Sequence, residues 1–252
     1  MATRNKLFVK ILIVLTLSTM IISCSSGSSS SSSDASQKRI TGFYYSFDES
    51  GPTIIDNSGN NFDGEASSLS RVTGKVGGAV QFLVPGSTIE LPILDYFPYE
   101  NGFSFRAWIK TDTPITTQQQ IIGALTSSQT AAIVSNFGIS LVNDSLSLEV
   151  PAQQNILSLT TSALSFPLNT WFHIAITYDG DSVSFYYNGN LVATDSILTT
   201  YSPYFQNYIG NNQRIFGGIQ IENQFIGYMD ELYLENVILT QSEIANYYAS
   251  TM

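Results

Sequence analysis

The chain has 252 residues, with 10 Lys and Arg against 20 Asp and Glu, so its formal net charge is −10. A surface this acidic repels the phosphate groups of nucleic acids and of anionic lipids, which makes both poor partners. The single cysteine excludes a disulfide within the chain, and one Cys with one His is too few for a zinc site.

The first residues have the features of an export signal. Arg4, Lys6 and Lys10 are followed by a mostly apolar run of twelve residues, 11–22. A transmembrane helix needs about 20 apolar residues to cross a bilayer, so this run matches the hydrophobic part of a signal peptide instead. Without these three basic residues, seven remain against the 20 acidic ones.

Cys24 ends the sequence Ile21-Ile22-Ser23-Cys24, which resembles the lipobox of bacterial lipoproteins. The resemblance implies cleavage before Cys24 and lipidation of that residue. Several acyl chains anchor a protein stably, whereas one chain alone is marginal. We therefore expect an exported domain of the cell envelope, anchored to a membrane through the Cys24 lipid. The same resemblance implies the outer membrane if the cell is Gram-negative, because Ser25 rather than an Asp follows Cys24.

The remaining chain divides by composition. Residues 1–23 form the expected signal peptide. Residues 24–37 form a linker, because positions 25–33 are eight serines and one glycine, which cannot bury apolar surface. Such a linker reaches roughly 20 Å on average. Residues 38–252 are enough for one large β-domain.

Period-2 alternation marks the strands of this domain. In residues 103–110, Phe-Ser-Phe-Arg-Ala-Trp-Ile-Lys, apolar side chains alternate with a second set that includes Arg and Lys. This pattern predicts a strand with one face in the core. Further short β-rich runs are expected at 121–125, 132–136, 138–142, 146–150 and 156–160.

A three-stranded meander is expected over residues 171–178, 183–188 and 191–194. Asp179-Gly180 and Asn188-Gly189 separate its strands, and both dipeptides tolerate the positive φ angles of tight turns.

One segment predicts a helix. Thr240 and Glu243 fit a capping box, and an apolar side follows over about two turns. Many short strands with a single short C-terminal helix predict an all-β fold, a two-sheet antiparallel jelly-roll sandwich.

Several short motifs occur along the domain in a fixed order: residues 45–48 (Tyr-Ser-Phe-Asp), 56–60 (Asp-Asn-Ser-Gly-Asn), 74–82 (Gly-Lys-Val-Gly-Gly-Ala-Val-Gln-Phe), 88–91, 103–109, 171–180, 185–189, 209–210, 227–231 and 239–244. In this order they resemble laminin G-like, concanavalin A-like jelly rolls of bacterial surface proteins. The resemblance implies two antiparallel sheets of roughly six or seven strands each. Relatives of this type include carbohydrate-binding modules, adhesive modules, glycan hydrolases and lyases, so the fold does not settle the function.

Candidate catalytic groups are few. Glycoside hydrolysis generally needs two carboxyl groups about 5–9.5 Å apart on one face. The Glu-x-Asp-x-x-Glu motif of the laminarinase-like branch is absent. Asp230 and Glu231 are adjacent, so alternation is expected to place them on opposite faces. His173 lies mid-strand and is interpreted as structural. We therefore expect no enzymatic activity, although a cross-strand acidic pair stays open.

Calcium is the metal that the resemblance implies, because members of this fold often hold one ion near the meeting of the first and last strands. Asp48 and Asp230 match the positions of its ligands, and hard oxygen ligands suit Ca²⁺. The alternative is that Asp48 starts a turn and Asp230 accepts hydrogen bonds from backbone amides of a neighbouring loop.

Aromatic residues in segments that read as loops are the candidate ligand-binding residues: Tyr96, Tyr99, Tyr201 and Tyr204. Exposed tyrosines stack on sugar rings and also anchor protein partners. The alternative is packing against the sandwich edge. The leading hypothesis is a non-catalytic binding module for glycans or another surface polymer. A protein–protein or adhesion module of a surface assembly is the second.

Overall fold

The computed structural model describes residues 42–92, 102–125, 135–152, 155–197, 206–210, 212–215 and 219–252. The chain divides into two compact units, Met1–Lys38 and Arg39–Met252, and every described residue belongs to the second. Cys24 and the four candidate tyrosines, at positions 96, 99, 201 and 204, lie outside the described residues. None of the helices in the described part is long and apolar enough to span a membrane.

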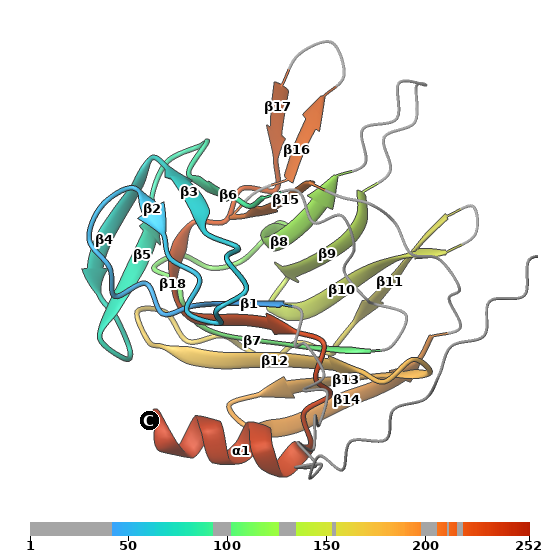
Figure 1. The fold of residues 1–252 in the computed structure, drawn as a ribbon. Helices are drawn as coiled ribbons and strands as arrows, with labels where there is room; N and C mark the ends of the chain where they lie inside the picture. The colour runs from blue at the N-terminus through green and yellow to red at the C-terminus, as the bar shows by residue number, and fades with distance from the viewer. Residues whose placement is uncertain are drawn as a thin grey trace, which may run out of the picture. The chain divides into compact units, whose positions relative to one another are not determined.

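Two antiparallel sheets form the layers of a sandwich (Figure 1). In the described residues the first, called sheet A here, has eight strands in the order β14-β13-β12-β7-β18-β5-β4, with β1 also paired to β18. Its strands are β1 (Gly42–Tyr45), β4 (Leu69–Thr73), β5 (Gly78–Phe82), β7 (Phe103–Lys110), β12 (Phe172–Tyr178), β13 (Ser182–Tyr187), β14 (Asn190–Ser196) and β18 (Gly227–Glu235).

The second sheet, sheet B, also has eight described strands, in the order β11-β10-β9-β8-β15-β6-β3-β2, and a separate hairpin joins β16 to β17. The bounds are β2 (Thr53–Ile54), β3 (Gly64–Ser67), β6 (Thr88–Glu90), β8 (Gln119–Leu125), β9 (Ser135–Val142), β10 (Ser145–Ala152), β11 (Asn155–Thr160), β15 (Gln206–Ile209), β16 (Asn212–Ile215) and β17 (Ile219–Glu222). The predicted sandwich is confirmed.

The core lies between the sheets. Phe105, Ala107 and Ile109 of β7 belong to one buried apolar cluster with side chains of both sheets. Phe103 of β7 meets Phe137 of β9 edge to face, with ring centroids 5.6 Å apart. The alternation predicted for residues 103–110 is therefore confirmed, and the other side chains of β7 point to the outer face of sheet A.

The predicted meander is confirmed as β12, β13 and β14, and both turns contain positive φ angles, 102° at Gly180, 47° at Asn188 and 75° at Gly189. The separate strands expected at 132–136 and 138–142 are wrong in one respect, because β9 runs unbroken over Ser135–Val142. Gly138 does not end the strand. A side chain at this position would crowd Gln120, because a Cβ would lie 2.7 Å from its Nε2.

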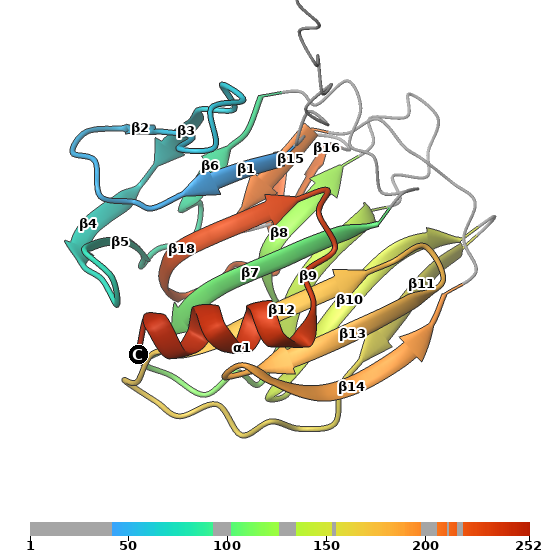
Figure 2. The same ribbon diagram turned by 60° about the horizontal axis from the view of Figure 1, so that its bottom comes forward.

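Helix α1 (Gln241–Ser250) covers part of the outer face of sheet A (Figure 2). Thr240 and Glu243 form the predicted capping box. Ile244, which is fully buried, packs with Ala175 and Tyr186 of the sheet. The helix therefore turns this part of the outer face into a second, smaller core.

His173 of β12 lies beneath the same helix and is 0% exposed. Its ring centroid is 5.4 Å from that of Trp108, 5.5 Å from Tyr247 and 6.1 Å from Tyr248. Neither ring nitrogen has a hydrogen-bond partner among the described residues. Burial, together with the charge of Arg106, lowers the pKa of His173 from 6.5 to about 3. The imidazole is therefore neutral at physiological pH.

This neutral histidine makes the fold sensitive to acid. Between pH 6.5 and about 3, His173 binds a proton in the unfolded chain but not in the folded one. The free energy of unfolding is therefore highest above pH 6.5 and decreases as the pH falls towards 3. We expect the unfolding free energy, measured by urea denaturation, to fall more steeply with acid than in a His173→Leu variant. The difference in slope should be about 1.4 kcal/mol per pH unit. Parallel curves for the two proteins would contradict a buried neutral histidine, since all other groups titrate in both.

Candidate functional site

The outer face of sheet A carries its polar and aromatic side chains in rows that run across the strands. Backbone pairing places Ala175, Arg106, Tyr233 and Tyr44 side by side, from β12 to β1. The rings of Tyr44 and Tyr233 stack with centroids 3.9 Å apart. Cζ of Arg106 lies 3.8 Å from the ring centroid of Tyr233 and 4.1 Å from that of Tyr247 of α1. We call this the covered row, because α1 packs over it.

Glu231 is the polar centre of the covered row. It accepts hydrogen bonds from the hydroxyls of Tyr44 at 2.8 Å, Tyr247 at 2.9 Å and Tyr233 at 3.2 Å, and it is 5% exposed. Burial is the main reason why the pKa of Tyr233 rises to about 12. Because the carboxylate accepts from β1, β18 and α1, it fastens the helix to the sheet.

A bulge in β18 brings Glu231 to this face. Asp230 pairs with Trp108 and Tyr233 with Arg106, so two residues of β18 lie opposite one residue of β7. Glu231 has a φ of 50°, in the left-handed region. The expectation that Asp230 and Glu231 lie on opposite faces is therefore wrong, because the extra residue interrupts the alternation.

Asp230 and Asp48 hold the hairpin between β4 and β5 from two sides. Oδ2 of Asp230 accepts hydrogen bonds from the backbone N–H of Lys75 at 2.7 Å and of Val76 at 2.8 Å. Oδ1 of Asp48 accepts one from Gly78 at 2.6 Å. Asp230 is fully buried and its Oδ1 has no partner among the described residues. Burial raises the pKa of Asp230 to about 7.

A second row crosses β7 at Lys110, two outward-facing positions beyond Arg106. Register brings Lys110 beside Tyr228 of β18, and Tyr228 beside Gln81 of β5. On the other side of β7, Phe172 is the first residue of β12 and pairs with Ile109. Trp171, one residue earlier, therefore lies beside Lys110. All four side chains are partly exposed. We call Trp171, Lys110, Tyr228 and Gln81 the open row.

The open row is held by direct contacts. Nζ of Lys110 lies 3.9 Å from the ring centroid of Tyr228 and 5.3 Å from that of Trp171. The hydroxyl of Tyr228 donates to Asp112 at 2.8 Å and accepts from Nε2 of Gln81 at 2.7 Å. The hydrogen bond to Asp112 is the main reason why the pKa of Tyr228 is raised. The row therefore offers aromatic faces, a cation, a carboxylate and an amide across four strands, a span of roughly 14 Å.

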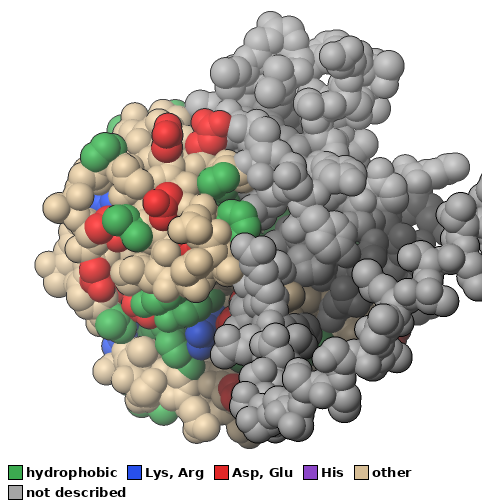
Figure 3. Space-filling model, in the orientation of Figure 1, with side chains coloured by type: hydrophobic (Ala, Val, Ile, Leu, Met, Phe, Trp, Pro, Cys, Tyr) green, Lys and Arg blue, Asp and Glu red, His purple; other side chains and the backbone are tan. Residues whose placement is uncertain are grey.

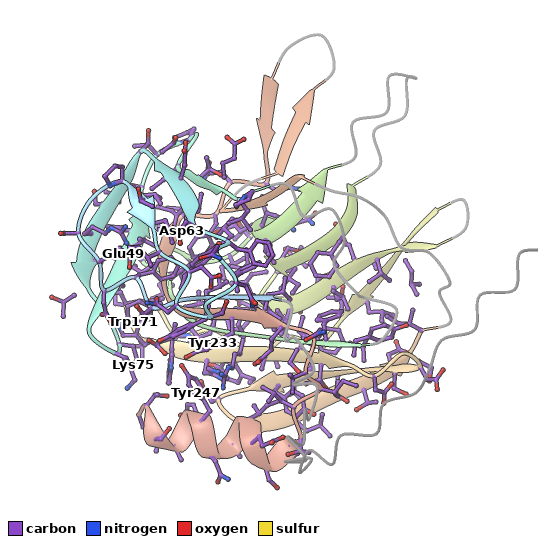
Figure 4. All side chains as sticks on the ribbon, in the orientation of Figure 1. Glu49, Asp63, Lys75, Trp171, Tyr233 and Tyr247 are labelled. Carbon is purple, nitrogen blue, oxygen red and sulfur yellow. The ribbon has the colours of Figure 1, made fainter. Side chains whose placement is uncertain are left out.

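Some of these residues can be followed in the figures. Figure 4 shows Trp171 and Lys75 towards one side of the molecule, and Tyr233 and Tyr247 nearer to its middle. In the same orientation, basic and hydrophobic side chains lie next to each other above helix α1, while acidic side chains are scattered over the upper strands (Figure 3).

The open row was missed by the sequence analysis, which looked for aromatic residues in loops. A usable signal was present in the alternation of residues 103–110, which places Lys110 on the outer face, and in the Trp that begins segment 171–178. What the sequence does not contain is the strand order, and only that order brings Trp171, Lys110 and Tyr228 together.

Comparison with solved structures supports the fold. The binding domain of Paraclostridial Mosquitocidal Protein 1 is similar, with a TM-score of 0.63, 19% identity and coverage of 82% of this chain and 51% of that one. The binding domain of botulinum neurotoxin DC in complex with SialylT gives a TM-score of 0.62 at 13% identity, covering 84% of this chain and 51% of that one. This chain thus spans only about half the length of those domains.

An enzyme is also among the similar structures. Trypanosoma rangeli sialidase in complex with sialic acid gives a TM-score of 0.60 at 18% identity, covering 83% of this chain and 32% of that one. The prediction that this chain is not an enzyme is therefore contradicted, since its fold occurs in an enzyme. Two of the reasons for that prediction also fail. The bulge puts Asp230 and Glu231 on one face, and glycoside hydrolysis can use a tyrosine nucleophile in place of a carboxylate pair.

These likenesses, all below 25% identity, show the fold alone. No curated protein matches the sequence. A family profile does match, over residues 85–245, and these residues include most of both sheets and the first half of α1. By this match the chain belongs to the concanavalin A-like lectin/glucanases superfamily, as a Laminin_G_3 domain.

Proposed function

We propose that the domain is a carbohydrate-binding module and that the open row contacts the ligand. The observation that carries this proposal is the partly exposed pair Trp171 and Tyr228, whose ring centroids are 6.2 Å apart, beside the polar groups of Lys110, Asp112 and Gln81. Sugar rings have an apolar face that stacks on aromatic side chains and hydroxyls that bond to polar ones. The similar toxin structures are both named as binding domains, which supports a binding role for this domain.

A receptor protein is the second candidate ligand, and a different surface favours it. Leu191 and Val192 of the edge strand β14 are 51% and 40% exposed. Apolar side chains on an open strand edge can pair with a strand of another protein.

Replacing Trp171 tests the carbohydrate proposal. We expect the purified protein to bind a subset of saccharides on a glycan array, and Trp171→Ala to lower the affinity by about tenfold or more, because an aromatic anchor is lost. Isothermal titration with the best array ligand measures the change.

The matched control is Leu191→Ala, which removes an exposed apolar side chain from β14 and should leave saccharide affinity unchanged. Thermal unfolding of each variant checks that the fold is retained. If the array is silent, or if Leu191→Ala weakens binding as much as Trp171→Ala, the open row is not a saccharide site.

We also propose that the domain is displayed on the cell envelope by a lipid on Cys24, on the outer membrane if the cell is Gram-negative. The apolar run of residues 11–22 and the lipobox-like sequence before Cys24 support this. The serine-rich linker would let the domain reach ligands near the membrane surface.

Cys24→Ser tests the anchor. We expect the unchanged protein to sediment with membranes and to incorporate a labelled fatty acid, whereas Cys24→Ser should lose the label and nearly all of the membrane-bound fraction. Ser26→Ala, two residues further in the same linker, is the control and should behave as the unchanged protein. Equal sedimentation of Cys24→Ser and the unchanged protein would overturn the anchor.

We keep calcium as a proposal for Asp48 and Asp230. The free, buried Oδ1 of Asp230 supports it, because an oxygen without a hydrogen-bond donor suits a cation. The described residues contain no group of three or more His, Cys, Asp or Glu that could hold a metal. Backbone carbonyls or water would therefore have to supply the remaining oxygens.

Thermal unfolding tests the calcium proposal. If Ca²⁺ binds the folded state, millimolar Ca²⁺ should raise the melting temperature by several degrees over excess EDTA, because a ligand of the native state shifts the folding equilibrium. Asp48→Asn should reduce that increase. A melting temperature that is the same in EDTA and in Ca²⁺ would remove the proposal.

A further inference from the structure

Positive charge is scarce in this domain, so its placement is informative. After residue 41 the sequence has only five Lys and Arg, which are Arg71, Lys75, Arg106, Lys110 and Arg214. Arg71 pairs with Glu49 at 3.0 Å, and Arg106 approaches Glu235 at 3.8 Å. Within the described residues, neither Lys75 nor Lys110 has a carboxylate within salt-bridge distance.

These two ammonium groups lie on the same face and against aromatic rings. Nζ of Lys75 is 4.9 Å from the ring centroid of Trp108, and Lys110 contacts the rings of Tyr228 and Trp171. Trp108 and Lys110 are two residues apart on β7, so their side chains project to one face about 7 Å apart. An aromatic face attracts a cation but does not neutralise it. Both charges are therefore available to an anion.

We propose that the open row selects acidic saccharides, in which a sugar carboxylate pairs with Lys110 while the sugar ring stacks on Trp171. This inference rests on the proposed function and specifies its ligand class. An unpaired ammonium beside an aromatic face matches a ligand that has both a negative group and an apolar ring face. In a domain where acidic residues far outnumber basic ones, Lys75 and Lys110 offset on this face part of the repulsion that an anionic ligand meets.

Asp112 and Gln81 fit the same ligand without competing for the cation. The carboxylate of Asp112 accepts from the hydroxyl of Tyr228, and Gln81 donates to that hydroxyl. Both side chains therefore fix the ring of Tyr228 and leave their other polar atoms for sugar hydroxyls. Lys75, in the hairpin between β4 and β5 and over the ring of Trp108, would meet a second negative group of a longer chain.

Matched acid and ester ligands test the inference. The probes are oligogalacturonate, alginate oligosaccharides and sialyllactose, each beside its methyl ester, which keeps the sugar rings and removes the charge. By isothermal titration we expect at least one acid to bind on the order of tenfold more tightly than its ester. Salt at 1 M should reduce that preference, because it screens exposed charges.

Three variants assign the preference to one side chain. Lys110→Gln should abolish the difference between acid and ester, and Lys110→Arg should retain it. Arg214→Gln removes the same charge from β16, outside sheet A, and should change the preference less than twofold. Thermal unfolding confirms that each variant is folded.

The outcomes separate the inference from the proposed function. Equal affinity for acid and ester, or an equal effect of Lys110→Gln and Arg214→Gln, overturns the acidic-ligand inference and leaves saccharide binding intact. Absence of binding to every saccharide, neutral or acidic, overturns the proposed function and the inference with it.

Discussion

The bulge in β18 is the constraint on which the outer face of sheet A depends. One extra residue between Asp230 and Tyr233 turns two consecutive carboxylates towards the same side of the sheet. Asp230 then accepts from the amides of the hairpin between β4 and β5, and Glu231 accepts from three tyrosine hydroxyls. The strained φ of Glu231 is offset by these bonds, since hydrogen bonds to a charged group contribute about 1.5–3 kcal/mol each.

Helix α1 divides this face into two parts with different roles. Beside the covered row, Tyr247 and Tyr248 of the helix pack against His173, which is fully buried. The helix and its C-terminal end also contact Trp108, whose Nε1 donates a hydrogen bond to Thr251 at 3.2 Å. One step further along β7 the side chains are partly exposed, and there the sheet presents Trp171, Lys110 and Tyr228.

The fold could be predicted from the sequence because its signals are local. Alternation in residues 103–110, the two turn dipeptides and the capping box at Thr240 each act within a few residues, and all three agree with the structure. The bulge could not be predicted, because adjacent Asp and Glu in a strand read as opposite faces until the pairing with β7 is known. The long-range pairing of β7 with both β12 and β18 is also what assembles the open row.

Outside the described residues, the predicted lipid site at Cys24 and the four tyrosines at 96, 99, 201 and 204 stay predictions. The candidate site that the structure does provide was not among them. Binding residues are often found in loops, which explains why the sequence favoured those four positions. In this domain, however, part of the outer face of sheet A is partly exposed, so side chains of strands are available to a ligand.

The separation of the two rows has a consequence for how this domain can diversify. The backbone hydrogen bonds between the strands of the open row do not depend on the side chains of that row. The carboxylates that hold the helix and the hairpin lie in a different part of the face. Positions 81, 110, 171 and 228 can therefore change in charge and shape at little cost to folding. Natural variation or library selection could therefore change the ligand specificity while the scaffold stays the same. The face of a sheet would then carry the variable positions, as loops do in antibodies.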